Sequence, residues 1–404
     1  MNKAITLTAA ILCFVFVNGV RAEEEGTPME ALQRKTPSGQ YVDPASFFRF
    51  HGYISLSYTE AEEALGTEPG STPQILVSGP SPRTGKNEGG FKNDAALFVG
   101  GEPFEGVGGV IEIHFVGDAA DPVITEAKMT WDLVGSEGGD FTFRLVGGRY
   151  WWPFGIHNGE WFSAVNRFSL LSPAAAEVLS AHYNEVGVMG EGELRLHSNL
   201  GLNYVVSVGN GVPGFGLMGN VRGTQFDTNG NRALTGRVGL VLLSALDAEL
   251  GFSASGGKLR SAEDGNFGEN DPQRYEADFT AFGPDLTLGW KGLGLRSYLY
   301  TSSEDLSGAS VDDLARDGVT LEPSYTFKRD ATRFKEITLV GRYGLADEET
   351  LSGDTFKRTQ LGIGLNVHIT KAFIARAGFV SQGEDEELSD VDNNAFSISL
   401  TSEF

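Results

Sequence analysis

Apolar and polar residues alternate with a period of two along several short segments of this chain. The last segment places its apolar residues on one side of an extended strand, with Ser402 as the polar exception: Phe396, Ile398, Leu400 and Phe404. The residues on the other side are Ala395, Ser397, Ser399, Thr401 and Glu403. Because successive side chains of a strand point to opposite faces, such a strand has one apolar and one polar face. A sheet built from strands of this kind separates an apolar phase from water.

The same division occurs earlier, where one apolar set alternates with one polar or small set: Leu361, Ile363, Leu365 and Val367 against Gln360, Gly362, Gly364, Asn366 and His368. Averaged hydropathy hides this pattern, because only every second residue of a transmembrane barrel strand faces lipid. Beyond the N-terminal segment there is no run of about 18 apolar residues, so no membrane-spanning helix is predicted. The 54 Gly, 27 Phe and 11 Tyr suit glycine-rich turns and aromatic girdles.

Sixteen strand-like segments follow one another, bounded by clusters of Gly, Asn, Asp and Pro. They span 48–58, 91–101, 107–117, 123–134, 140–150, 184–197, 199–209, 233–243, 246–256, 274–290, 293–303, 317–328, 335–345, 357–369, 371–382 and 393–404. The tenth segment is interrupted by Gly283–Pro284. The predicted fold class is all-β: a 16-stranded antiparallel transmembrane β-barrel with an inward-folded third outer loop.

The connections between these segments alternate in length. Long ones are 59–90, 151–183, 210–232, 257–273, 304–316, 346–356 and 383–392, and short ones are 102–106, 135–139, Ser198, 244–245, Lys291–Gly292, 329–334 and Thr370. Only 118–122 breaks the rule. Short periplasmic turns, longer outer loops and an even strand number are typical of bacterial outer-membrane barrels. Sixteen strands leave an aqueous channel, and no linker divides the chain, so 47–404 is predicted to be one barrel domain.

The N-terminal 22 residues have the features of a secretory signal peptide. Lys3 supplies the positive start, Ala4 to Val17 the apolar core, and Val20–Arg21–Ala22 a cleavage site. The only cysteine, Cys13, lies in this segment, so the predicted mature chain has no thiol for a disulfide, a metal site or a nucleophile. Residues 23–46 are polar and lack the strand pattern. We expect them to form a periplasmic N-terminal tail on a protein of the bacterial outer membrane.

Charge and motif content exclude several classes of function. The formal net charge is −23, which argues against nucleic acid as a partner. None of the six histidines forms a metal-spaced pair with another, and no G-x-S-x-G motif occurs. No nucleophile with an accompanying base was identified. The sequence therefore predicts no catalytic residue, no cofactor and no metal, and the protein is not expected to be an enzyme.

Extending the alternation inward places eight arginines on the lumen side: Arg49, Arg144, Arg195, Arg237, Arg296, Arg342, Arg358 and Arg376. Arginine rings in a pore favour anions, because a guanidinium offers several donors to a carboxylate or phosphate. The alternative is that these arginines pair with lumen acids such as Glu112, Glu126, Asp132, Glu193, Asp247 and Glu249. A register slip of one residue would reverse any of these side chains, so both interpretations stay open.

The third outer connection, 151–183, begins within the sequence GGRYWWPFGIHNGEWF, which spans 147–162. Long loops inside β-proteins are usually functional, and we predict that 151–183 narrows the pore. The residues assigned to this constriction are Arg149, Trp151, Trp152, Pro153, Phe154, Gly155, Trp161 and Arg167. Its aromatics are expected to anchor the loop rather than stack on a solute, and Arg167 to meet the solute. Strict alternation puts Arg149 on the lipid side, so it must lie at the rim or follow a bulge at Gly147–Gly148.

The stretch VGGRYWWPFGIHNGEWFSAVNRFSLLSP resembles the phosphate-selective porin O/P family, through Gly148, Arg149, Pro153, Phe154 and Gly155. Downstream, NEVGVMGEGEL and LNYVVSVGNG look like the next hairpin of that family, with Tyr204, Asn210 and Gly211 in the expected places. The resemblance covers about 140–211 and implies a 16-stranded barrel, often trimeric, whose third long loop folds inward. The lysine-rich ring and ordered arginine ladder of phosphate-specific members are not recognisable, so phosphate selectivity is not implied.

The predicted function is a passive outer-membrane channel for small hydrophilic solutes with an anionic preference. Expected partners are those solutes, outer-membrane lipid and two further copies in a homotrimer, with no nucleic acid. One alternative is a barrel enzyme, such as a lipase or protease, which predicts a Ser–His or Asp–His group near the rim on neighbouring strands. Another is a structural barrel that binds peptidoglycan or another partner through 23–46.

Overall fold

The structure is a computed structural model that describes most of the barrel. The described residues are 49–61, 88–104, 106–116, 123–135, 139–156, 184–210, 232–243, 246–262, 274–305, 314–328, 335–349, 355–384 and 394–404. The predicted signal peptide 1–22 and the tail 23–46 lie outside them. So do residues 157–183, which make up most of the predicted constriction loop.

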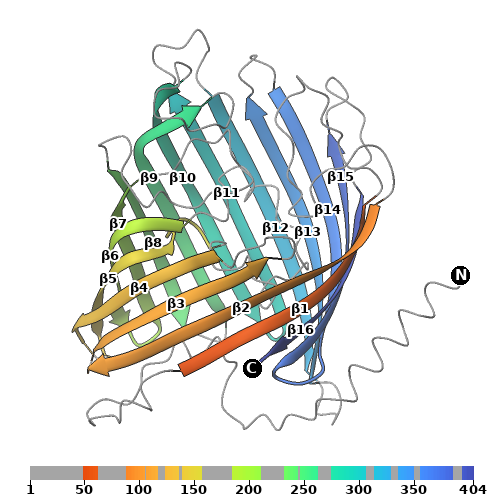
Figure 1. The fold of residues 1–404 in the computed structure, drawn as a ribbon, viewed down its shortest axis with the longest axis horizontal. Helices are drawn as coiled ribbons and strands as arrows, with labels where there is room; N and C mark the ends of the chain where they lie inside the picture. The colour runs from red at the N-terminus through yellow and green to blue at the C-terminus, as the bar shows by residue number, and fades with distance from the viewer. Residues whose placement is uncertain are drawn as a thin grey trace, which may run out of the picture.

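Sixteen antiparallel strands close into a single barrel (Figure 1). They are β1 (Arg49–Ala61), β2 (Glu88–Phe104), β3 (Val107–Val116), β4 (Val123–Val134), β5 (Phe141–Trp151), β6 (Asn184–His197), β7 (Leu200–Gly209), β8 (Ala233–Leu243), β9 (Asp247–Ala262), β10 (Arg274–Trp290), β11 (Leu293–Asp305), β12 (Leu314–Lys328), β13 (Glu336–Glu349), β14 (Thr355–His368), β15 (Phe373–Glu384) and β16 (Ala395–Glu403). Each strand pairs with its sequence neighbours, and β1 pairs with β16. The predicted 16-stranded antiparallel barrel is confirmed.

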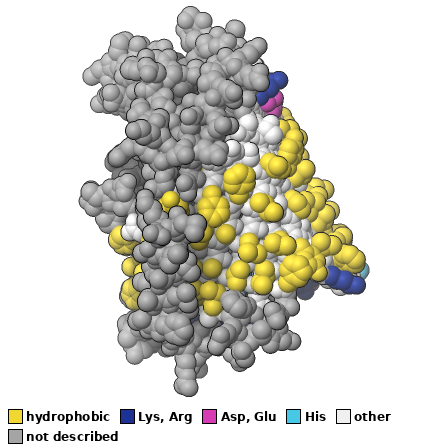
Figure 2. All heavy atoms as spheres, turned by 90° about the vertical axis from the view of Figure 1, so that its right-hand side faces the viewer, with side chains coloured by type: hydrophobic (Ala, Val, Ile, Leu, Met, Phe, Trp, Pro, Cys, Tyr) yellow, Lys and Arg dark blue, Asp and Glu magenta, His cyan; other side chains and the backbone are white. Residues whose placement is uncertain are grey.

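The two faces of the wall differ as the alternation predicts. On β16, Ser397 and Thr401 are fully buried on the inner face, whereas Phe396 and Phe404 are exposed on the outer face. Large hydrophobic side chains cover the outer face, and Figure 2 shows them as a broad apolar surface on the described part of the wall. Exposed apolar side chains in such numbers would be unstable in water, so this face meets lipid.

The closing seam depends on a glycine that faces the last residue of the chain. The backbone N–H of Gly52 donates to the carbonyl of Phe404 at 3.0 Å, and the N–H of Phe404 donates back at 2.9 Å. A Cβ atom on Gly52 would lie 2.7 Å from both the ring of Phe404 and the carbonyl oxygen of Ala96. Closure removes the free strand edges that hydrocarbon does not tolerate.

Strand β10 continues through Gly283 and Pro284, where the sequence pattern is interrupted. Toward β9 its residues are paired without a break from 274 to 289. Toward β11 the pairs stop at Phe282 and resume at Asp285 in the same register. Proline has no N–H to donate to a ladder, which accounts for the gap on one side only.

The connections leave the barrel at two different ends. The strand ends joined by the short turns, such as those on either side of Lys291–Gly292, lie at the end of the barrel that holds the C-terminus. The strand ends joined by the long connections lie at the opposite end. Strand β3 ends and β4 begins at this opposite end, so the short connection between them, predicted as 118–122, is the exception to the alternation of lengths. Short turns mark the periplasmic end of such barrels, so β5 runs outward and ends at the external mouth.

Among the described residues, no helix is long and apolar enough to cross a membrane.

Candidate solute pathway

The chain turns into the barrel at the end of β5. Trp152 and Phe154 are almost fully buried, and their rings stack with centroids 4.7 Å apart. The indole Nε1 of Trp152 donates to the hydroxyl of Thr235 on the inner face of β8 at 2.8 Å. The ring of Phe154 meets that of Tyr300, on the inner face of β11, edge to face at 5.2 Å. The segment that follows β5 therefore lies against the inner wall several strands away.

The backbone of the next two residues is also bound to that wall. The N–H of Gly155 donates to Oγ of Ser253 on β9 at 2.9 Å, and the N–H of Ile156 donates to the hydroxyl of Tyr300 at 3.3 Å. Gly155 has a φ of +66°, and a Cβ there would lie 1.8 Å from the Tyr300 hydroxyl oxygen. Only glycine fits both the backbone conformation and the close approach.

Trp151 is the last residue of β5, and its indole also reaches the inner face. Its Nε1 donates to Oε2 of Glu112 on β3 at 3.4 Å, and Glu112 is completely buried. Trp151, Trp152 and Phe154 therefore all contact residues of the inner wall. That they anchor the loop stays a prediction. Trp161 and Arg167 lie outside the described residues, so their roles stay predictions.

Arg149 lies on the outer face near the end of β5. It sits opposite Ala127 of β4 and Val186 of β6, and β5 pairs with β6 without a shift from 141 to 151. The predicted alternative of a bulge at Gly147–Gly148 is therefore wrong. The guanidinium of Arg149 donates to the carbonyl of Ile124 at 3.4 Å. An arginine side chain is long enough to keep its guanidinium in a polar environment while its aliphatic stem lies along apolar surface.

Two glycines between 140 and 211 occupy positions where a larger side chain would clash. Gly148 has a φ of +124°, and a Cβ there would lie 2.3 Å from the carbonyl oxygen of Ala127. A Cβ on Gly187 would lie 2.8 Å from the hydroxyl of Tyr150. Tyr150 and Glu185, both almost fully buried, occupy the inner face beside these positions. Gly187 thus leaves room for the hydroxyl of Tyr150, and Gly148 for the close approach of the β4 backbone.

All eight predicted lumen arginines have inner-face positions by the alternation of their strands. They are distributed over β1, β5, β6, β8, β11, β13, β14 and β15: Arg49, Arg144, Arg195, Arg237, Arg296, Arg342, Arg358 and Arg376. Inner-face position does not decide whether a side chain meets a solute. Their role as pore-lining residues stays a prediction.

Several of these arginines are held by carboxylates. Arg237 makes two hydrogen bonds to Asp285, at 3.0 and 2.6 Å, and an ion pair with Glu249 at 2.7 Å. Arg342 donates to Oε1 of Glu322 at 2.7 Å, and both residues are buried. The predicted alternative, pairing with lumen acids, applies to these positions. The sequence had pointed to Glu249 as a candidate lumen acid, but not to Asp285 or Glu322.

Arg316 was missed by the sequence analysis. It lies on the inner face of β12, is buried, and bonds to the buried Glu304 of β11. The predicted strand began at 317 and so excluded it. Extending the predicted strand by one residue would have included Arg316, because it shares the alternation of Thr320 and Glu322.

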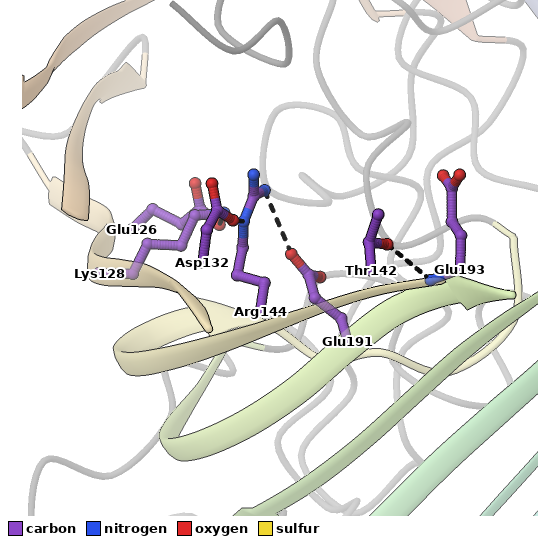
Figure 3. Close-up of polar contacts among 7 residues, drawn as sticks. All are labelled: Glu126, Lys128, Asp132, Thr142, Arg144, Glu191 and Glu193. Atoms are coloured by element: carbon purple, nitrogen blue, oxygen red, sulfur yellow. Dashed lines mark hydrogen bonds and ion pairs between the residues drawn. The ribbon is translucent and has the colours of Figure 1, made fainter. Parts of the chain in front are cut away.

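The inner face of β4, β5 and β6 carries a second charged group, which remains partly exposed. Arg144 pairs with Asp132 at 2.7 Å and with Glu191 at 3.5 Å, and Lys128 pairs with Glu126 at 2.6 Å. The side chains of Arg144 and Glu191 are 32% and 36% exposed, so solvent in the lumen reaches both signs of charge. Figure 3 shows these residues together with Thr142 and Glu193, pointing to the same side of the wall.

One Asp–His pair occurs on neighbouring strands, as the barrel-enzyme alternative requires. His114 of β3 contacts Asp94 of β2, and the hydroxyl of Tyr53 bonds to Asp94 at 3.0 Å and to Nε2 of His114 at 3.3 Å. His114 is 3% exposed, so its imidazole is closed off inside this network. Within the described ranges no group of three or more His, Cys, Asp or Glu side chains is placed to hold a metal ion.

Comparison with known proteins gives a fold but no sequence family. No protein-family model matches the chain, and no curated protein matches its sequence. Solved structures do match. The trimer form of OmpT, an outer-membrane protein of Vibrio cholerae, has a TM-score of 0.55 at 11% identity over 88% of this chain and 99% of that one. The chain has the fold of an outer-membrane porin.

Two further structures support this assignment. An anion-selective porin from Comamonas acidovorans has a TM-score of 0.55 at 11% identity, covering 88% of this chain and 99% of its own. The outer-membrane channel DcaP of Acinetobacter baumannii has a TM-score of 0.53 at 12% identity, covering 88% and 97%. At these identities the likeness concerns the fold alone. Together with the apolar outer face of a closed barrel, it places this porin-like chain in the bacterial outer membrane.

Proposed function

We propose that this protein is a passive channel for small hydrophilic solutes across the outer membrane, and not an enzyme. The observation that carries the proposal is a closed 16-stranded barrel whose inner face is polar and charged. A barrel of this size has room for water inside, whereas an eight-stranded one is filled by its own side chains. Two similar structures are named as a porin and a channel, which supports the proposal.

The narrowest part of the channel is proposed to be the loop 157–183 together with the segment that leads into it. Trp152, Gly155 and Ile156 are bound to the inner faces of β8, β9 and β11, so the connection starts out across the lumen. In this proposal Arg167 meets the solute while Trp152 and Phe154 only anchor the loop. The likeness to the phosphate-selective porin O/P family and a homotrimeric assembly belong to the same proposal, the latter supported by the trimer form of one similar structure.

The proposed anion preference is modest. Arg237 and Arg342 carry positive charge on the inner face, but carboxylates offset both of them. Where the inner wall is more exposed, arginine and glutamate lie side by side, as at Arg144 and Glu191. Charge of both signs near the pathway weakens the selectivity that a ring of unpaired arginines would give.

Planar-bilayer recording tests the channel and its selectivity together. The purified barrel should insert with discrete conductance steps, and a salt gradient should give a reversal potential displaced slightly toward the value for chloride. Absence of conductance from correctly folded protein would refute the channel. A reversal potential displaced toward the cation would refute the anion preference alone.

The proposed absence of enzymatic activity is tested at the buried Asp94–His114 pair. Wild-type barrel and a His114→Gln variant should both fail to hydrolyse phospholipid or peptide substrates above the detergent blank. Hydrolysis by the wild type that disappears in His114→Gln would favour the barrel-enzyme alternative. Folding of the variant is checked by the shift in gel mobility on heating.

A further inference from the structure

Three consecutive hairpins carry a lysine at the periplasmic end of the barrel. Lys291 lies in the turn between β10 and β11, Lys335 directly precedes β13, and Lys371 lies in the turn 369–372 between β14 and β15. We name these three residues the basic collar. None of the described residues in these turns is acidic. Lys291 and Lys335 are exposed and have no ion pair with another described residue.

Backbone hydrogen bonds join the turns of the basic collar into one edge. The N–H of Thr326, on β12, donates to the carbonyl of Gly292 at 2.8 Å. The N–H of Lys335 donates to the carbonyl of His368, the last residue of β14, at 3.0 Å. The lysines are therefore fixed along a continuous rim of the wall formed by β10 to β15.

Apolar and aromatic side chains lie on the outer face just above this rim. Trp290 and Leu293 are 48% and 50% exposed, and Tyr325 and Phe327 form an edge-to-face pair at 4.4 Å. The ammonium of Lys291 lies 5.1 Å from the centroid of the Trp290 ring. Figure 2 shows basic side chains at the lower border of the apolar surface, and basic and acidic side chains together at its upper border. Aromatic rings of this kind mark the boundary between hydrocarbon and headgroups.

The opposite end of the same wall has the opposite charge. Asp278 faces Asp305 across β10 and β11, and Asp317 faces Asp347 across β12 and β13, all four exposed on the outer face. Nearby lysines offset this only in part, as where Lys258 pairs with Asp278 at 3.8 Å. The wall is thus acidic at the external edge of its apolar face and basic at the periplasmic edge.

We propose that the basic collar binds the phosphate groups of anionic phospholipids in the periplasmic leaflet. An ammonium offers three donors to phosphate oxygens, and the exposed rings beside it suit the glycerol and upper acyl region of the same lipid. Each lysine near a membrane surface adds to the attraction for anionic lipid. The proposal rests on the position of the barrel in the membrane and is independent of what passes through the lumen.

The test compares lipid selection by the full-length barrel in mixed vesicles of phosphatidylcholine and phosphatidylglycerol. Spin-labelled forms of the two lipids report which one occupies the protein surface. The wild type should prefer phosphatidylglycerol by roughly threefold or more at low salt, and the preference should fall as salt is raised. The variant Lys291→Gln/Lys335→Gln/Lys371→Gln should lose it.

Two controls make the result decisive. Replacing the same lysines by arginine keeps the charge and should keep the preference, whereas Lys258→Gln/Lys357→Gln removes lysines near the external end and should leave it unchanged. A wild type without preference, or a collar variant that retains it, would overturn the proposal. Conductance recorded on the same preparations shows separately whether the channel proposal holds, because none of these lysines lies on the inner face.

Discussion

Gly155 is the residue whose replacement bears most directly on the position of the long connection after β5. Its positive φ and the 1.8 Å approach of a Cβ to the Tyr300 hydroxyl leave no room for a side chain. Gly155→Ala should therefore push the backbone away from β9 and β11 and weaken the bonds to Ser253 and Tyr300. The expected result is a single-channel conductance changed by tens of per cent, with noisier open levels, measured in planar bilayers.

Gly147 offers a matched control for this substitution. It lies in β5, a few residues before Gly155, and a Cβ there would meet nothing within 4 Å. Gly147→Ala should leave conductance unchanged. Equal conductance in Gly155→Ala and the wild type would mean that the described anchor does not control the pathway.

Substitution of Arg237 is expected to destabilise the barrel, because the buried carboxylate of Asp285 would lose its charged partner. Arg237→Gln leaves Asp285, whose side chain is fully buried, without its two hydrogen bonds. Loss of one partner of a buried pair costs about 3–5 kcal/mol. The midpoint of thermal unfolding, followed by gel mobility or circular dichroism, should fall clearly in this variant.

Two comparisons test the physical reason for that loss. Arg237→Gln/Asp285→Asn removes both charges and should recover part of the stability, since neutral amides tolerate burial better than a single carboxylate. Lys258→Gln breaks an exposed pair at 3.8 Å and should cost about 0–1 kcal/mol. If all three variants unfolded at the wild-type temperature, the Arg237 network would make no measurable contribution to the stability of the barrel.

At the scale of the strands, the period-two pattern was enough to locate nearly every element and face. It works because lipid on one side and water on the other impose opposite requirements on successive residues. Strand ends were less predictable. Strand β12 begins at Leu314 rather than at 317, and so Arg316 was missed.

Pairing partners could not be predicted from the pattern. Arg237 bonds to Asp285 across an intervening strand, and that contact depends on the registers of β8, β9 and β10 together. The lipid-side position of Arg149 followed from alternation alone, whereas its contact with Ile124 depends on tertiary neighbours. The inward course of 152–156 depends on Thr235, Ser253 and Tyr300, which are distant in sequence.

The seam between β1 and β16 predicts a folding defect. Gly52→Val would place branched side-chain atoms where the ring of Phe404 and the carbonyl of Ala96 already lie. Closure should become slower and less complete, so a smaller fraction of the protein should show the heat-modifiable gel mobility of a folded barrel. Gly147→Val, on an open outer-face position, is the control, and equal folded fractions for both would contradict the steric argument.

For the whole molecule, selectivity should respond to single exposed charges of the inner face. Arg195 and Glu193 lie two residues apart on β6, and both are exposed. Arg195→Gln should move the reversal potential toward the cation, and Glu193→Gln should move it by a similar amount toward the anion. Shifts in the same direction, or none, would place the determining charges in another part of the lumen.

The seam also fixes the order of events in assembly. Tyr53 pairs with Glu403, so the strand made first and the strand made last must meet before the barrel exists. No cylinder can form before the final strand has been made, and until then the sheet keeps two unpaired edges, one on β1 and one on the last strand formed. A product shortened by a single strand would therefore keep two permanent edges, which hydrocarbon does not tolerate.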